Sequence, residues 1–311
     1  MPLHKLSGLI LLFITFGFSN AFAQYADLPI TIEVEYNDEG EPTFYAKNES
    51  FTPYTVSLDF SSVSNAMPPN PNPYKKTVRF GRTKVLEIEK SGMADSYVRF
   101  SYTYSYNIGC MDTEPDELEY LLPVGKGKAT EIFGLSHIGE MFDKETPDDF
   151  YALGFRAEAG DTVYASRGGT ITDIEVDHDD SETENYFTSN YNYVQIVHED
   201  CTFGSYSHLK KDGILVEVGD DIVAGDPIGI VASKEDEAEI GFRFTLAYKN
   251  DDYRSGSDDK YWNYSVPLFR TSVEKSAKLK PDHMYRAVHP VDIITQEMGW
   301  FERRRWKKRN R

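Results

Sequence analysis

Alternation of apolar and polar residues restricts this chain more than any other feature of its sequence. Residues 30–36 alternate along their whole length, and a β-strand sends successive side chains to opposite faces of a sheet. Further strand-like runs follow at residues 43–46, 54–58, 78–80, 83–88 and 97–106. Turn-forming residues separate them, including a loop rich in Pro and Asn at 67–73. For residues 24–120 this pattern predicts a β-sandwich of immunoglobulin-like size.

The second half of the chain is also predicted to consist of strands. Residues 122–128 have the composition of a linker or an entry strand, and glycine turns are frequent beyond them. A polar, acidic stretch at 177–190 is predicted to be a surface loop. We therefore expect an all-β chain with a sandwich at 24–120, a second β domain at 121–300 and a basic tail at 301–311.

The N-terminus has the composition of an export signal. Lys5 supplies a positive charge, residues 6–18 are apolar, and Ala-Phe-Ala at 21–23 fits the small-x-small rule for cleavage. An uncleaved membrane anchor is the alternative, but this apolar stretch is short for crossing a bilayer. We expect residues 1–23 to be a cleaved signal peptide and the protein to be periplasmic or extracellular.

Charge and cysteine content narrow the set of partners. With 33 Lys and Arg against 51 Asp and Glu the net charge is −18, and such a surface repels nucleic acids and anionic membranes. The basic residues at 303–311 break the trend, and fit either an anionic contact or a solvated, frayed terminus.

Cys110 and Cys201 fit either a disulfide between the two halves or two separate buried thiols, and form no metal motif.

Four segments of the second half occur in the order found in one peptidase family. They are residues 160–171, the strand 192–198, the Y-x-H-L strand 205–209 and the hairpin 216–229. With residues 151–155 upstream, this region resembles the lysostaphin/LytM-type zinc peptidases of family M23, roughly over 123–250. The resemblance implies an antiparallel β domain of the duplicated-hybrid-motif type. The hairpin alone also resembles biotinyl and lipoyl carrier domains, but Lys234 lacks the context that carries their cofactor.

The resemblance implies a zinc site, and several of its ligand positions are changed in this chain. A catalytic zinc takes three protein ligands and leaves one position for water; the family supplies a His and an Asp from one motif and a His from an H-x-H strand. By this resemblance Phe150 stands at the first His position and Gly154 at the Asp position. Alternation over 240–246 makes 242, 244 and 246 the inward set, which puts Gly241 and Arg243 at the H-x-H positions. Glycine has no ligand atom, and arginine stays protonated and repels a metal ion.

Two histidines are candidates for retained family residues. His208 stands at the histidine of Y-x-H-L, two residues after Tyr206. The alternative is that it is an ordinary strand histidine held by packing. His137 aligns more loosely with the first ligand, across an insertion at 140–149. We expect no catalytic residue beyond the remnant His208 and no metal site. The expected binding residues are Arg243, His208, Gly241 and Tyr206.

Other residues with chemical potential receive ordinary interpretations. His178 and His198 are expected to be loop and strand-end residues, and His283 and His289 lie beyond the motif region. Asp179, Asp180, Glu182 and Glu184 are interpreted as an acidic loop, not as a calcium site or a glycosidase pair. The sequence contains no G-x-S-x-G, P-loop, H-E-x-x-H or G-x-G-x-x-G motif.

These observations favour a pseudopeptidase: an exported, non-catalytic LytM-like module that binds a cell-wall peptide or an envelope protein and needs no cofactor. Degenerate members of the resembled family bind and activate cell-wall amidases, and Arg243 is expected to hold a carboxylate of the partner. An active zinc endopeptidase acting on peptidoglycan cross-bridges is the alternative, and in that case zinc is the cofactor. A third hypothesis is an adhesion or carbohydrate-binding protein led by the sandwich.

Overall fold

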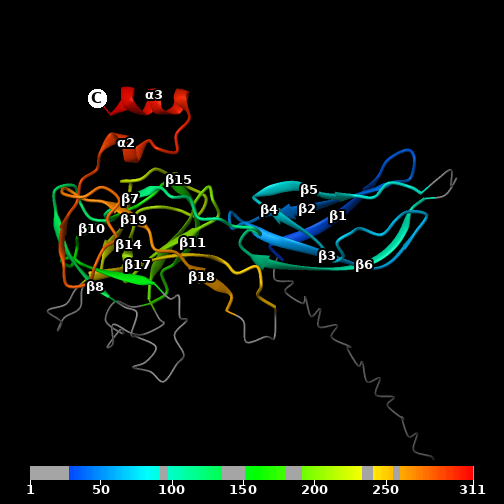
Figure 1. Cartoon of the computed structure of the whole chain (residues 1–311), viewed down its shortest axis with the longest axis horizontal. Helices are drawn as coiled ribbons and strands as arrows, with labels where there is room; N and C mark the ends of the chain where they lie inside the picture. The colour runs from blue at the N-terminus through cyan, green and yellow to red at the C-terminus, as the bar shows by residue number, and fades with distance from the viewer. Residues whose placement is uncertain are drawn as a thin grey trace, which may run out of the picture.

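A computed structural model describes residues 28–91, 97–134, 151–178, 191–232, 241–254 and 260–310. Within these ranges the regular secondary structure is almost entirely β-strand, with two short helices at the C-terminal end (Figure 1). The all-β fold class predicted from the sequence is therefore confirmed. The predicted signal peptide at 1–23, His137, Phe150 and the acidic residues 179–184 lie outside the described residues.

The first half forms two three-stranded antiparallel sheets that share one core. One sheet contains β1 (Ile30–Tyr36), β2 (Pro42–Asn48) and β5 (Gly81–Glu87), and the other contains β4 (Tyr74–Val78), β3 (Tyr54–Ser64) and β6 (Arg99–Ile108). Phe44 and Ala46 of the first sheet are buried with Val56, Leu58 and Phe60 of the second. This is the sandwich arrangement that alternating strands predict.

One predicted strand of the sandwich is displaced. The strand expected at 78–80 instead runs over Tyr74–Val78. The side chain of Val78 is buried in the core, whereas Phe80 is exposed and stacks on Phe51, with ring centroids 4.5 Å apart. The ring of Phe80 packs beyond the edge of the core, and Phe80 lies outside the strand.

The second half contains a large, mainly antiparallel sheet. Its strand order is β15 (Asp221–Ile222), β11 (Gly169–Glu175), β12 (Tyr193–Val197), β13 (Phe203–Ser207), β17 (Gly241–Lys249), β9 (Ala152–Arg156), β8 (Ala129–Gly134) and β20 (Met284–Arg286), and β18 (Trp262–Tyr264) also pairs with β17. A smaller sheet contains β10 (Thr162–Tyr164), β16 (Pro227–Val231) and β14 (Leu209–Ile214), and a parallel pair contains β7 (Glu119–Leu121) and β19 (Leu268–Arg270). One hydrophobic core lies between these sheets.

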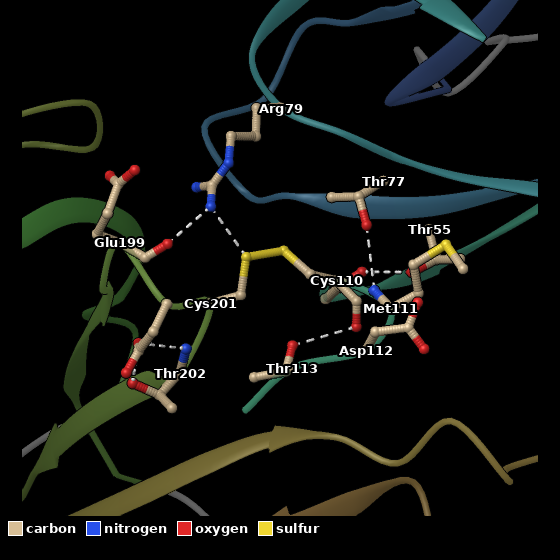
Figure 2. The surroundings of a disulfide bond; sticks show 12 residues. Thr55, Thr77, Arg79, Cys110, Met111, Asp112, Thr113, Glu199, Cys201 and Thr202 are labelled. Atoms are coloured by element: carbon tan, nitrogen blue, oxygen red, sulfur yellow. Dashed lines mark hydrogen bonds between the residues drawn. A yellow bond between two sulfur atoms is a disulfide. The ribbon is translucent and has the colours of Figure 1, made fainter. Parts of the chain in front are cut away.

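A disulfide joins the two halves (Figure 2). Cys110 follows β6 of the sandwich and Cys201 precedes β13 of the large sheet, and their Cα atoms are 6.0 Å apart. Arg79 donates hydrogen bonds to the Sγ atom of Cys201 at 3.0 Å and to the carbonyl of Glu199 at 2.9 Å. Of the two alternatives that the sequence left open, the structure has the disulfide.

A buried arginine ties the C-terminal segment to the second half. The side chain of Arg167 has no exposed surface and forms ion pairs with Asp200 and Glu297, both at 2.7 Å, and with Asp116 at 3.2 Å. Its guanidinium also donates to the hydroxyl of Tyr120 at 3.1 Å. A buried charge is tolerated only when such partners surround it, so Arg167 fixes Glu297 and the segment that follows.

The C-terminal segment ends in α2 (Val291–Ile294) and α3 (Trp300–Arg309). Most of the predicted basic tail is therefore an ordered helix, and the frayed terminus considered from the sequence is wrong for residues 301–309. Neither helix, nor any other in the part of the chain described here, combines the length and apolar content needed to cross a membrane.

Candidate functional site

The face of β17 and its neighbouring strands that points away from the core carries Arg243 and Gly154, two of the predicted ligand positions. Phe242, Phe244 and Leu246 are buried in the core, as the alternation of this strand predicts. Arg243, Thr245 and Ala247 therefore point to the opposite face. Strand pairing continues this face onto β9, β13 and β12, because residues paired across strands share a face.

A groove of about 350 Å³ runs over this face. Its lining consists of five aromatic residues, four neutral polar residues, two alanines and one arginine: Tyr191, Tyr193, Phe203, Trp262, Tyr264, Gln195, Ser205, Ser207, Thr245, Ala152, Ala247 and Arg243. Among these lining residues Arg243 is the one charged side chain. The groove therefore offers aromatic faces, neutral hydrogen-bonding groups and a single half-buried cation.

Gly154 and Arg243, two of the predicted ligand positions, are brought directly together. Arg243 pairs with Gly154 of β9 on one side and with Ser207 of β13 on the other. Gly154 pairs in turn with Phe133 of β8. The row Phe133, Gly154, Arg243 and Ser207 therefore crosses four strands on the groove face of the sheet.

The space beside Gly154 is filled by an aromatic ring. A Cβ atom built on Gly154 would lie 2.0 Å from Cε2 and 2.2 Å from Cζ of Phe133, far inside the 3.5–4.0 Å of a normal carbon contact. Any side chain at residue 154 therefore requires Phe133 to move. The ring stands where an Asp side chain at this position would begin.

The neighbouring backbone leaves no room for a side chain at residue 241. A Cβ atom on Gly241 would lie 2.3 Å from the carbonyl oxygen of Phe155 on the neighbouring strand. Backbone in a paired strand cannot move as an exposed side chain can. Gly241 therefore contributes only its main chain to the site, and it does not line the groove.

These residues do not fit the zinc ion that the resemblance implies. Zinc requires deprotonated nitrogen, sulfur or oxygen ligands in a tetrahedral arrangement. Gly154 and Gly241 offer no ligand atom, Phe133 fills the space at Gly154, and the guanidinium of Arg243 is a permanent cation. Within the described residues no group of three or more His, Cys, Asp or Glu side chains is arranged to hold a metal.

His208 adjoins the groove at its Arg243 end. It directly follows Ser207, is buried, and its ring centroid lies 5.3 Å from that of Tyr191, which lines the groove. Its φ angle is +67°, in the left-handed region that costs a non-glycine residue about 1–2 kcal/mol. His208 is thus a strained residue directly after β13, and its ring packs near Tyr191 of the groove lining.

Tyr206 does not lie where the sequence analysis expected a binding residue. It is fully buried, points into the core between the sheets, and its hydroxyl accepts a hydrogen bond from the backbone N–H of Ser166 at 2.7 Å. The reason is strand alternation: Ser205 and Ser207 take the groove face, which sends the residue between them inward. Tyr206 therefore packs in the core and does not line the groove.

His198 is a buried core histidine. Its Nδ1 lies 2.7 Å from the carbonyl oxygen of Gly168, which makes this nitrogen the donor of the neutral ring. Burial, followed by the charge of Arg167, lowers the pKa of His198 from 6.5 to about 4. The ring is therefore neutral at physiological pH, and it lies on the core side of the sheet beside Tyr120.

The aromatic walls of the groove were not identified from the sequence. Tyr193 and Phe203 belong to strands that were predicted, and their positions on the groove face follow from alternation. Burial, and a hydrogen bond to Asp173, raise the pKa of Tyr193, so its hydroxyl remains protonated and donates to that carboxylate. Trp262 and Tyr264 enter through the pairing of β18 with β17, and no local pattern in the sequence signals this pairing.

Comparison with known proteins agrees with the resemblance seen in the motifs. Residues 150–254 match the profile of peptidase family M23. Similar solved structures include the solution structure of lysostaphin (23% identity, 36% of this chain and 40% of that chain, TM-score 0.26). They also include the lysostaphin catalytic domain from Staphylococcus simulans (21%, 44% and 88%, 0.27) and a zinc-containing peptidase from Vibrio cholerae (12%, 70% and 82%, 0.32). The chain thus spans less than half of the full lysostaphin chain. No curated protein sequence matches it.

Proposed function

We propose that the protein is a non-catalytic relative of peptidase family M23, whose profile matches residues 150–254. In this proposal the groove over β17 binds a peptide-containing ligand of the cell envelope. The observation that supports the proposal is the row Phe133, Gly154 and Arg243, in which an aromatic ring and a cation occupy positions that the resemblance assigns to metal ligands. The strands of the fold are intact, so the groove remains after its hydrolytic chemistry is gone.

The chemistry of the groove supports an extended peptide as the ligand. The guanidinium of Arg243 presents donors in a planar fork that matches a carboxylate. The lining also contains neutral hydrogen-bonding groups, from Gln195, Ser205, Ser207 and Thr245. The aromatic side chains of the lining give flat apolar contact area to the rest of the ligand. A cell-wall peptide with a free carboxylate, or an acidic segment of an envelope protein, has this combination of groups.

Location at the envelope is part of the same proposal. The predicted signal peptide at 1–23 supports export. The disulfide between Cys110 and Cys201 supports an oxidising compartment, because cytosolic thiols are kept reduced. Fractionation of cells expressing the full chain, followed by mass spectrometry of its N-terminus, tests both points. Recovery in the cytoplasm with residues 1–23 still attached would contradict export.

Binding to soluble muropeptides tests the proposed role of the groove. We expect the wild-type protein to bind them without cleaving them, and Arg243→Ala to weaken binding about tenfold or more, since a charge-assisted hydrogen-bonded pair contributes about 1.5–3 kcal/mol. Arg82→Ala is a matched control, because Arg82 pairs with Glu33 and Glu35 on the sandwich, away from the groove. Equal affinity of the Arg243→Ala variant with an unchanged fold would reject the role of Arg243.

Two other functions make different predictions in the same experiment. An active zinc endopeptidase would cleave the muropeptides and lose this activity on chelation. An adhesion or carbohydrate-binding protein led by the sandwich would keep its binding when Arg243 is replaced, and would lose it on changes to the sandwich surface.

A further inference from the structure

The C-terminal helix α3 presents an unusual surface. None of its ten residues is buried, and its first two, Trp300 and Phe301, are 64% and 74% exposed. Their rings contact each other edge to face, with centroids 4.7 Å apart. Figure 1 shows α3 standing clear of the β-sheets, beyond α2. Two large aromatic side chains are thus held in water at the start of an exposed helix.

Four cations extend from Trp300 along one face of this helix. Trp300, Arg303, Arg304, Lys307 and Lys308 together line a shallow hollow of about 490 Å³. Their spacing of three, four, seven and eight residues places them on one face of an α-helix. The guanidinium carbon of Arg304 lies 5.5 Å from the centre of the Trp300 ring, in a cation–π arrangement. The face therefore combines one aromatic anchor with a row of positive charge.

The charge on this face is available to an external partner. No ion pair joins Arg304, Lys307 or Lys308 to an acidic group in the described part of the chain. Six Lys and Arg residues in the helix face a single Glu, whereas the whole chain carries a net charge of −18. The helix is therefore a local positive site on an acidic protein, and an anionic surface would attract the helix while repelling the rest.

The helix is also held in a defined orientation. The guanidinium of Arg303 donates to the carbonyl of Thr295 at 2.7 and 3.1 Å. Ile293 of α2 is buried with Leu121 and Ala224, and the neighbouring Glu297 is paired with Arg167. Because these contacts fix the base of α3, its aromatic and cationic groups approach a surface as one unit.

We propose that α3 docks the protein onto an anionic lipid surface, with Trp300 and Phe301 entering the headgroup region and Arg304, Lys307 and Lys308 contacting lipid phosphates. Trp is favoured at the boundary between headgroups and acyl chains, and basic residues are drawn to anionic lipids. The adjacent exposed aromatic pair favours a lipid surface over a polyanion in solution, because lipid alone offers an apolar layer next to the phosphates. The helix is about 15 Å long at 1.5 Å per residue, so it lies on the surface and does not cross it.

Co-sedimentation of the full chain with lipid vesicles tests the proposal. We expect binding to vesicles that contain phosphatidylglycerol, weak or no binding to pure phosphatidylcholine vesicles, and release by high salt. Replacing Arg304, Lys307 and Lys308 together by Ala should weaken binding about tenfold or more. Trp300→Ala combined with Phe301→Ala should weaken it as well, and blue-shifted Trp fluorescence in the wild type should report entry into the headgroup region.

The matched control removes charge elsewhere. Lys278 and Lys280 are exposed and lie outside the helix, so replacing both by Ala should leave vesicle binding unchanged. Equal vesicle binding by the wild type and the triple variant, with unchanged circular dichroism, would overturn the proposal. Absence of vesicle binding would overturn it too. This holds even if α3 then proves to bind another anionic partner, such as a DNA duplex or the acidic surface of a second copy of the chain.

Discussion

Arg243 lies directly opposite Gly154 in the antiparallel pairing of β17 with β9, and the ring of Phe133 fills the space above Gly154. In this arrangement a glycine, a bulky ring and a cation occupy one row of the sheet. The three residues complement each other in volume, because the absence of a side chain at residue 154 makes room for Phe133. The Phe133 ring therefore leaves no room for a side chain at residue 154.

Adding a side chain at residue 154 should therefore destabilise the protein. We expect Gly154→Ala to lower the free energy of unfolding by about 1–3 kcal/mol, the usual cost of overpacking, because its Cβ would lie 2.0 Å from the Phe133 ring. In a Phe133→Ala background the same substitution should cost at least about 1 kcal/mol less, since contacting residues couple. Urea unfolding of the four proteins of this double-mutant cycle measures the coupling.

Gly299→Ala is the control for this cycle. A Cβ atom at Gly299 would meet nothing within 4 Å, and its φ of −59° is accessible to alanine. Its unfolding curve should match that of the wild type to within about 0.5 kcal/mol. If Gly154→Ala were equally harmless, the Phe133 ring would not be held over residue 154 as described.

The disulfide should stabilise the junction between the two halves. Cys110 and Cys201 are 91 residues apart in the sequence, and closing a loop of this size constrains the unfolded chain by roughly 4–5 kcal/mol in the chain-entropy treatment. Replacing both cysteines by Ser should lower the melting temperature. Adding dithiothreitol should lower that of the wild type and leave the double variant unchanged. A melting temperature that neither change affects would show that the other contacts suffice.

Buried His198 should make stability fall in mild acid. Its pKa is about 4 in the folded protein and 6.5 when exposed. Above pH 6.5 the ring is neutral in both the folded and the unfolded state, so His198 adds no pH dependence to the free energy of unfolding. Between pH 6.5 and 4 the histidine is protonated in the unfolded state but not in the folded state. The free energy of unfolding therefore falls by about 1.4 kcal/mol for each pH unit that the pH is lowered. Below pH 4 this contribution levels off.

His198→Asn removes this titration and retains a donor for the carbonyl of Gly168. Urea unfolding between pH 7 and 4 should show a smaller loss of stability for this variant. Its free energy of unfolding should change less steeply with pH, by the equivalent of up to one bound proton. His283→Gln, a replacement of an exposed histidine, is the comparison variant in the same series. Parallel slopes for the wild type and His198→Asn would contradict a neutral His198.

The left-handed backbone of His208 gives a separate prediction. Both His208→Ala and His208→Gly delete the ring that packs near Tyr191, but only glycine adopts a φ of +67° without steric cost. The glycine variant should therefore be more stable than the alanine variant by about 1 kcal/mol. Thermal unfolding of the two proteins measures this difference, and a more stable alanine variant would rule out the strain.

Much of this architecture was predictable because local patterns determine it. The strand from 30 to 36 and the inward set Phe242, Phe244 and Leu246 follow from alternation alone. The register of β17 against its neighbours then follows, because a slip of one residue would expose these three apolar side chains. That register places Arg243 on the groove face.

The remaining features depend on which strands are neighbours, and alternation contains no such information. Phe133 covers Gly154 only because β8 pairs with β9, and Trp262 reaches the groove only because β18 pairs with β17. The inward position of Tyr206 was missed because its motif was interpreted by resemblance and not by alternation. The partnership of Cys110 with Cys201 likewise depends on how the two halves meet.

Zinc content tests the central claim most directly. The full chain, incubated with excess zinc and then dialysed exhaustively, should retain less than about one tenth of a zinc ion per molecule by inductively coupled plasma mass spectrometry, because Gly154, Gly241 and Arg243 leave too few ligands for a stable site. One zinc ion per chain that survives dialysis and is removed only by a chelator would contradict the account.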